Sequence, residues 1–288
     1  MERACRRLGV SERRACRVLG QARGSQRYRR REAADAGRLV ERMRELSGRH
    51  PRYGYRRIAA LLRREGRAVN VKRVHRLWTA EGLKVPRKQH RKRRLGSPAN
   101  GCTRRRAERK DQVWSYDFVE DRTENGRRLK LLTVVDEFTR ECLTIEADRE
   151  MTSEDVVRTL DYLFAVRGAP EHIRSDNGPE FTARKVRRWL SASGVGTLYI
   201  QRASPWENAY VESFNGKLRD ELLNRELFLS LAEARYVIDE WRLEYNRRRP
   251  HSALGYRTPA AFAAACCGAG SAALRPPRNT LEQRTKLS

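Results

Sequence analysis

Three carboxylates stand in stretches of sequence that could bring them together. Asp117 lies in WSYDFV, Asp176 in IRSDNGPEF and Glu212 in SPWENAYVESFNGKLRDE, with 35 residues between the last two. Carboxylates that converge within about 4 Å repel by about 4 kcal/mol per pair at an effective dielectric near 20, so they bind protons or metal. Hard oxygen ligands suit Mg²⁺ or Mn²⁺, and a site for two such ions cleaves and joins phosphodiesters.

Each acid alone has a simpler interpretation. Asp176 could be an ordinary turn residue in Asp-Asn-Gly-Pro, Glu212 a solvated helix charge, and Asp117 a residue at a strand edge. A shared site therefore requires that the fold bring the three acids together.

The second half of the chain has the pattern of an α/β domain. We expect strands over 112–119, 130–138 and 142–147, with the first two joined by a hairpin at Asn125-Gly126. A helix capped by Thr152, the strand HIRSD, a helix ending at Gly194 and the strand TLYIQ follow. This order predicts a mixed sheet with an antiparallel meander at its edge and right-handed crossovers.

A further helix is expected to begin at the capping box Ser204-Pro205-Trp206-Glu207. Along it, one apolar stripe is aimed at the sheet, formed by Val211, Phe214, Leu218 and Leu222. Glu212 stands at the shoulder of that stripe, and Asn208, Asn215 and Arg219 share its face. A carboxylate there points into the crevice beside the sheet, where ligands of α/β sheets bind.

Positive charge is concentrated in the N-terminal part. Residues 1–110 contain 36 Lys+Arg and 9 Asp+Glu, a net of +27, whereas the remaining residues contain 63 − 36 = 27 basic and 36 − 9 = 27 acidic residues. A membrane surface could also take a basic face, but neither an apolar face nor a lipidation signal accompanies it. Nucleic acid is therefore the favoured partner of this half.

The N-terminal part has the pattern of short helices. Residues 11–31 predict two, with Ser11 as N-cap and an apolar stripe of Ala15, Val18 and Leu19. Residues 37–84 predict a longer helix–turn–helix unit, whose third helix is capped by Asn70 and buries Val74, Leu77 and Trp78. Lys72, Arg73 and Arg76 lie on its other faces, which is either a solvated basic face or the DNA-contacting face of a recognition helix.

Five segments follow from these patterns. They are a helix–turn–helix-like segment (1–36), a helix–turn–helix DNA-binding domain (37–84), a basic linker (85–110), a catalytic core with C-terminal helices (111–263) and a disordered tail (264–288). The six cysteines form no CxxC pair, so reduced thiols are favoured over a zinc site. No apolar run reaches the length of a signal peptide or a membrane span, so we expect a cytoplasmic, nucleoid-associated protein.

At these residues the chain resembles the DDE transposase and retroviral-type integrase superfamily, and more narrowly the OrfB-type proteins of bacterial insertion sequences. The resemblance runs from about Cys5 to Phe262. It is carried by VSERRACRVLG, RYGYRRIAALL, VKRVHRLW, VWSYDFV, SDNGPEF, SPWENAYVESFNGKLRDE and YNRRRPHSALGYRTPAAF. It implies an α/β fold, a ribonuclease H-like mixed five-stranded sheet with flanking helices, preceded by an all-α helix–turn–helix region.

The resemblance also implies a mechanism. Asp117, Asp176 and Glu212 would ligate two Mg²⁺ ions, which Mn²⁺ can replace, for cleavage at the element's ends and strand transfer. Arg219, seven positions after Glu212, would touch DNA near the cut, and Asn177 and Lys217 are weaker candidates for the same role. The implied partners are double-stranded DNA of the element ends and target, further copies of this chain, and an upstream helix–turn–helix protein joined by frameshift fusion.

One departure and two alternatives accompany this interpretation. The histidines lack the spacing of the zinc-binding domain of retroviral integrases, which favours a transposase. His251 matches the family pattern but has no catalytic role that we can derive, and packing or capping is the favoured interpretation. A ribonuclease H-like nuclease that cuts without joining would use the same acids. A catalytically dead DNA-binding relic is the third possibility, although all three acids are present.

Overall fold

The computed structural model describes residues 2–28, 35–86, 106–175, 184–199 and 209–268. Within these ranges no helix is both long and apolar enough to cross a membrane. Four cysteines in the described part are free thiols, namely Cys5, Cys16, Cys142 and Cys266.

The chain begins with three short helices, α1 (Glu2–Leu8), α2 (Glu12–Val18) and α3 (Arg23–Arg27). Ser11 caps α2 as expected, because its hydroxyl accepts a hydrogen bond from the Arg14 amide. The expected apolar stripe is wrong: Val18 and Leu19 are 77% and 63% exposed, and Ala15 and Cys16 are the buried pair. On a helix this short, the turn that ends it carries Val18 and Leu19 away from the inner face.

A helical domain follows, made of α4 (Ala36–Arg49), α5 (Tyr55–Arg64) and α6 (Val71–Ala80). Its own apolar core includes Met43, Ile58, Leu62 and Val74, each fully buried. The Asn70 side chain caps α6 by accepting from the Lys72 amide at 2.8 Å, as the sequence predicts.

The described residues between Val113 and Tyr199 contribute five strands to one sheet, in the order β3-β2-β1-β4-β5. Its strands are β1 (Val113–Arg122), β2 (Arg128–Asp136), β3 (Cys142–Asp148), β4 (His172–Ser175) and β5 (Gly196–Tyr199). β1–β2 and β2–β3 pair antiparallel, whereas β1–β4 and β4–β5 pair parallel. This is the mixed sheet with an antiparallel meander expected from the sequence, and its strand order is that of the ribonuclease H-like fold. Gly126, with φ 76°, makes the expected hairpin turn.

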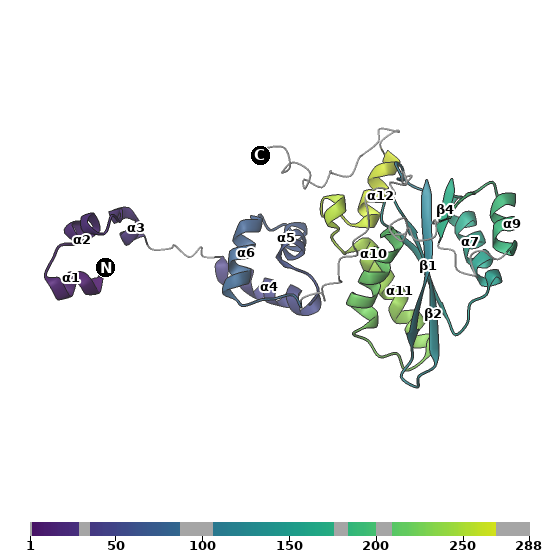
Figure 1. Ribbon diagram of the computed structural model, residues 1–288, viewed down its shortest axis with the longest axis horizontal. Helices are drawn as coiled ribbons and strands as arrows, with labels where there is room; N and C mark the ends of the chain where they lie inside the picture. The colour runs from purple at the N-terminus through teal and green to yellow at the C-terminus, as the bar shows by residue number, and fades with distance from the viewer. Residues whose placement is uncertain (1, 29–34, 87–105, 176–183, 200–208, 269–288) are drawn as a thin grey trace, which may run out of the picture.

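Helices cover both faces of the sheet (Figure 1). α7 (Ser153–Arg167) and α9 (Arg184–Ala192) pack on the face that carries Trp114 and Tyr116. α10 (Ala209–Leu218), the π-helical turn η2 (Arg219–Leu223) and α11 (Leu231–Arg247) pack on the face that carries Val119. Because side chains alternate along a strand, Asp117 points to the α10 face with Val119.

The chain ends in the short helix η3 (Ser252–Leu254) and in α12 (Pro259–Gly268). Residues 264–268 are therefore helical, which corrects the expectation of a disordered tail beginning at 264. Phe262 anchors α12 in a small apolar cluster with Phe138 and Leu254, and Cys266 packs against this cluster. The helix continues through Cys267 because alanine favours helix, and it ends at Gly268.

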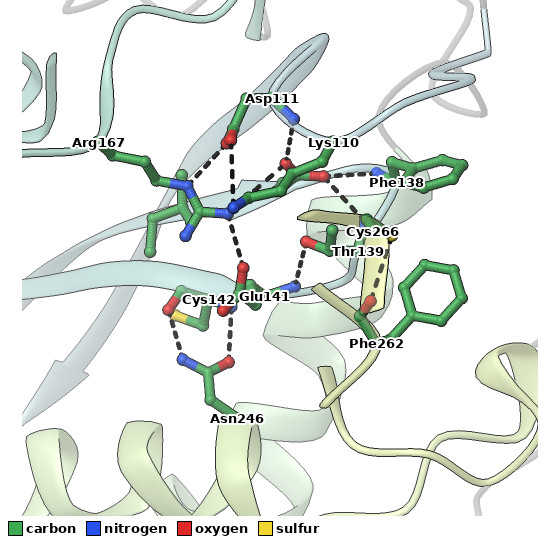
Figure 2. A network of polar contacts seen from close by, with 12 residues as sticks. Lys110, Asp111, Phe138, Thr139, Glu141, Cys142, Arg167, Asn246, Phe262 and Cys266 are labelled. Atoms are coloured by element: carbon green, nitrogen blue, oxygen red, sulfur yellow. Dashed lines mark hydrogen bonds and ion pairs between the residues drawn. The ribbon is translucent and has the colours of Figure 1, made fainter. Parts of the chain in front are cut away.

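A polar network fixes the end of the sheet where β1 begins (Figure 2). Arg167, the last residue of α7, donates to Asp111 at 2.7 Å and to Glu141 at 2.6 Å. The Asn246 side chain of α11 bonds both backbone groups of Cys142, at 2.9 and 2.8 Å. These bonds tie helices from both faces to the first residues of β1 and β3.

The helical domain contacts the core through arginines. Arg52 forms a two-pronged ion pair with Asp220 of η2, and its Nε lies 2.8 Å from Oδ2. Arg64 donates to the Arg248 carbonyl at 2.8 Å, at the end of α11, and Arg57 lies 3.7 Å from Glu221. The contact surface is thus formed by α5 and the loop before it on one side, and by η2 and α11 on the other.

Candidate active site

Asp117 lies in the middle of β1, half-buried, and pairs across the ladder with Thr133 of β2. Its Oδ1 accepts a hydrogen bond from the Phe118 amide at 2.8 Å. Its Oδ2 accepts from the Asn215 side-chain amide of α10, also at 2.8 Å. A carboxylate held at both oxygens has a fixed orientation, which a metal ligand requires.

Asn215 connects the helix to two strands. It is 7% exposed, and its Oδ1 lies 3.0 Å from the Thr133 hydroxyl, which in turn lies 3.1 Å from the Asp117 carbonyl oxygen. The apolar stripe of Val211, Phe214 and Leu218, all buried, presses this side of α10 onto the sheet as predicted. The helix that carries Glu212 is therefore positioned directly against the strand that carries Asp117.

Glu212 is exposed and lies three residues before Asn215. Residues three apart are neighbours on one side of a helix, about 5–6 Å between Cβ atoms. Glu212 thus stands one turn from the group that bonds Asp117, in the direction of the helix N-terminus.

Asp176 and Asn177 lie outside the described residues, as does the expected capping box at 204–207. Asp176 follows Ser175, the last residue of β4, directly in sequence. β4 lies beside β1 in parallel register, with Arg174 opposite Ser115. Within the described residues no group of three His, Cys, Asp or Glu side chains could hold a metal ion, so the triad remains a prediction.

A buried ion pair joins β4 to the same face of β1. Arg174 is 4% exposed and Glu137 1%, and the Arg174 Nε lies 2.9 Å from Glu137 Oε1. The Ser115 hydroxyl donates to the same oxygen, two residues before Asp117. Glu137, which directly follows β2, therefore holds Arg174 of β4 and Ser115 of β1 together, two residues before Asp117 along β1.

Arg219 and Lys217 occupy different faces of the helix. Arg219 is exposed, shares the Glu212 side of α10, and donates to the Glu120 carbonyl on β1 at 2.9 Å. Lys217 is half-buried and donates to the Ser213 hydroxyl at 3.1 Å. Burial, and the nearby charges of Arg249, Arg140 and Arg57, lower the pKa of the Lys217 amine to about 7, partly opposed by Glu221.

Comparison with known proteins identifies the domains of this chain. Models described as integrase core domain match residues 107–205 and 193–259, and one described as HTH-like domain matches residues 34–93. A 31.7 kDa protein of insertion element IS407 from Burkholderia multivorans is 45% identical over 264 residues, which is 90% of this chain and 92% of the relative. The transposase InsD for insertion element IS2D of Escherichia coli is 30% identical over 80% of each chain.

The chain belongs to the insertion-sequence transposases with an integrase core domain. A chain of the simian T-cell lymphotropic virus intasome, in complex with PP2A regulatory subunit B56 gamma, is also similar, with TM-score 0.49, 18% identity, and coverage of 74% of this chain and 72% of that one. Family membership makes this protein a DDE-type polynucleotidyl transferase of DNA transposition.

The basic residues on α6 of the transposase differ in their surroundings. Lys72 and Arg76 are exposed, whereas Arg73 forms a two-pronged ion pair with Asp35, at 2.6 and 3.0 Å. The exposure of Lys72 and Arg76 is thus equally consistent with a solvated basic face and with a face that contacts DNA. Arg73 is half-buried and would have to leave Asp35 to reach a phosphate.

The sequence assigns Asn215 no role of its own. Helical spacing places this residue on the face of Glu212 and indicates nothing more. The available signal was a polar residue at the edge of an apolar helical stripe, where burial requires a hydrogen-bond partner. The partner is Asp117, and it could not be identified without knowledge of the sheet register.

Proposed function

We propose that Asp117, Asp176 and Glu212 form the catalytic carboxylate site with which this transposase cleaves DNA at the ends of its element and joins those ends to target DNA. The observation that carries the proposal is the hydrogen bond between Asn215 and Asp117, because it ties the helix of Glu212 to the strand of Asp117. Asp176 enters through its position directly after β4, the parallel neighbour of β1.

The donor set fits divalent metal ions. Carboxylate oxygens are the ligands that Mg²⁺ prefers, and Asp117 and Glu212 both offer them. The three acids would hold two Mg²⁺ ions, and Mn²⁺ suits the same ligands. When bound, such ions activate a water or a DNA 3′-hydroxyl and stabilise the leaving oxygen. The contribution of the protein is orientation: the Phe118 amide and Asn215 hold the Asp117 carboxylate in one rotamer.

The partners follow from the charge distribution and the domains. The positively charged first 110 residues would bind double-stranded DNA of the element ends and target, through Lys72, Arg73 and Arg76 on α6. Arg219 would contact DNA beside the cut, as would Asn177, whereas Lys217 lies on another side of α10 and would contact DNA there. Pairing of two ends calls for an oligomer of this chain on DNA, and a frameshift fusion to an upstream helix–turn–helix protein would be a second form of the enzyme.

A strand-joining assay tests the catalytic assignment. The substrate is the DNA that flanks the gene, with Mg²⁺, and the variants are Glu212→Gln and Asp117→Asn. We expect joined products from the wild type, none from either variant, and unchanged DNA binding by both. The matched control is Glu240→Gln, since Glu240 is also an exposed helical glutamate, on α11, away from Asp117.

Three outcomes would contradict the proposal in different ways. Equal joining by wild type and Glu212→Gln would remove Glu212 from the site. Cleavage without any joined species would favour the nuclease. Binding with neither reaction, from this chain and from its upstream fusion alike, would indicate a relic.

A further inference from the structure

Arg140 is a half-buried cation with a buried polar atom that lacks a hydrogen-bond partner within the described part of the chain. Arg140 lies in the turn between β2 and β3, and its Nη1 is buried with no hydrogen-bond partner among the described residues. Its guanidinium carbon lies 3.6 Å from the centre of the Tyr210 ring of α10. A buried guanidinium donor that lacks an acceptor is costly, so an oxyanion is a fitting partner.

The turn holds Arg140 in place before any ligand arrives. Arg140 has φ 66°, a left-handed conformation that is unusual for a residue with a side chain. The Asp136 carboxylate accepts from the Phe138 and Thr139 amides at 2.8 and 2.9 Å, and the Arg140 amide donates to the Asp136 carbonyl at 3.0 Å. This strained conformation is thus imposed by the turn, a pattern found at binding sites.

A second cation lies on the side of α10 that faces Arg140. Tyr210, Ser213 and Lys217 are spaced three and four residues apart, so they share one side of the helix. That side differs from the apolar stripe and from the side of Glu212. The Lys217 amine donates to the Ser213 hydroxyl, and its remaining donors can bind an anion in front of Arg140.

Two more arginines add positive charge behind this pair. Arg249 is 2% exposed and bonds both oxygens of Glu221, and Arg57 of the helical domain lies 3.7 Å from the same carboxylate. One carboxylate thus faces several cations. His251 lies 3.3 Å from Arg249 and is affected by this excess of positive charge. Burial, and then the charges of Arg249, Lys217, Arg57 and Arg140, lower the pKa of His251 far below the usual value, so its imidazole is neutral.

We propose that Arg140 and Lys217 together bind one phosphate of the DNA backbone, in a site made positive by Arg57 and Arg249. The site joins the helical domain to the core on a side of α10 other than that of Glu212. The identification of the phosphate as that of DNA rests on the proposed function, since an inorganic phosphate has the same oxyanion chemistry. A DNA strand bound here would contact both domains at once.

The test measures DNA binding by the full chain in EDTA, so that no strand is cut. Binding of a fluorescent duplex from the gene's flank is followed by anisotropy over a range of salt concentrations. The variants are Arg140→Met, Lys217→Met and both together, which keep the apolar stems. Arg188→Met on α9, exposed on the opposite face of the sheet, is the matched control.

One lost phosphate contact reduces the slope of log K against log salt by about 0.9. We expect that reduction from each single variant and the same reduction from the double variant, because both residues hold one phosphate. The control keeps the wild-type slope. An unchanged slope in the single variants, no DNA binding by the wild type, or twice the reduction in the double variant would each overturn the shared site.

Two further readouts separate binding from a structural role and DNA from free phosphate. Lys217→Met should not lower the unfolding temperature, because it removes a charge from a site with excess positive charge; a marked fall would assign Lys217 to structure. Bound DNA should block chemical acetylation of Lys217. The extent of acetylation is measured by mass spectrometry, with Lys185 as the reference. Equal protection by inorganic phosphate at the same phosphate concentration would assign the site to the free ion. If the wild type binds DNA but joins nothing, the proposed function is refuted. The phosphate site is still tested in that case, because the slopes of log K against log salt do not depend on joining.

Discussion

Replacement of Asn215 separates two roles that this residue could have, orienting Asp117 or merely filling space. In Asn215→Ala, Asp117 Oδ2 loses a donor at 2.8 Å, while Oδ1 keeps the Phe118 amide and Thr133 keeps the Asp117 carbonyl as acceptor. A hydrogen bond to a charged group contributes about 1.5–3 kcal/mol. Since about 1.36 kcal/mol corresponds to tenfold in rate, joining should slow by roughly 10- to 150-fold.

Asn215→Asp keeps the shape and reverses the interaction. It places a second carboxylate against Asp117, and two such charges about 4 Å apart repel by about 4 kcal/mol at an effective dielectric near 20. One of the two carboxyls then retains a proton or swings away, so the orientation of Asp117 is lost. The expected order of rates at neutral pH is wild type, then Asn215→Ala, then Asn215→Asp.

The assay is single-turnover strand joining with a pre-cut DNA end at saturating Mg²⁺, with DNA affinity and unfolding temperature measured alongside. Asn224→Asp, at an exposed asparagine that follows η2, controls for the added charge and should join at the wild-type rate. If Asn215 only filled space, the isosteric Asn215→Asp would be nearly as active as wild type and Asn215→Ala the poorest. That reversed order would refute the orienting role.

Three further predictions concern stability. Glu221→Gln leaves the buried Arg249 without its carboxylate, so the free energy of unfolding should fall by about 3–5 kcal/mol in urea titrations, whereas Glu226→Gln, at an exposed position, should have little effect. Ile58→Ala opens a cavity in the helical domain and should cost about 2–5 kcal/mol, seen as a separate early melting transition with loss of DNA binding; a single unshifted transition would contradict an independent core. The pKa of Lys217 is about 7 in the folded chain and 10.5 for an unperturbed lysine, so the unfolded chain binds more protons between these two values. Stability should therefore rise with pH across that window. Lys217→Met should abolish the rise, which is measured as urea midpoints at pH 7 and 9.

Elements set by local pattern were predictable from the sequence. The Asn125-Gly126 hairpin and the Thr152 and Asn70 caps each depend on neighbours within a few residues. The buried stripe on α10 likewise follows from helical periodicity. The apolar stripe assigned to Ala15, Val18 and Leu19 failed because α2 has only 7 residues, about two turns, which gives too few positions to define a face.

Contacts between distant segments were not predictable. Arg52 and Asp220 are separated by 168 residues, and each alone reads as an ordinary surface charge. The bond between Asn215 and Asp117 spans 98 residues and depends on the strand register. Arg140 offered no local signal either, because its left-handed conformation is imposed by hydrogen bonds to Asp136 rather than by its residue type.

α10 explains why the site and the DNA-binding surface are mechanically linked. One side of it buries Val211, Phe214 and Leu218 in the core, and the adjoining position, Asn215, holds Asp117. A third side carries Lys217 towards the positive site beside the helical domain, and the helix continues into η2, whose Asp220 bonds Arg52. A shift of α10 that moved Glu212 relative to Asp117 would therefore disturb the domain contact as well. Because a packed helix moves as a unit, DNA bound at Arg140 and Lys217 would hold α10 in the position that the carboxylates require.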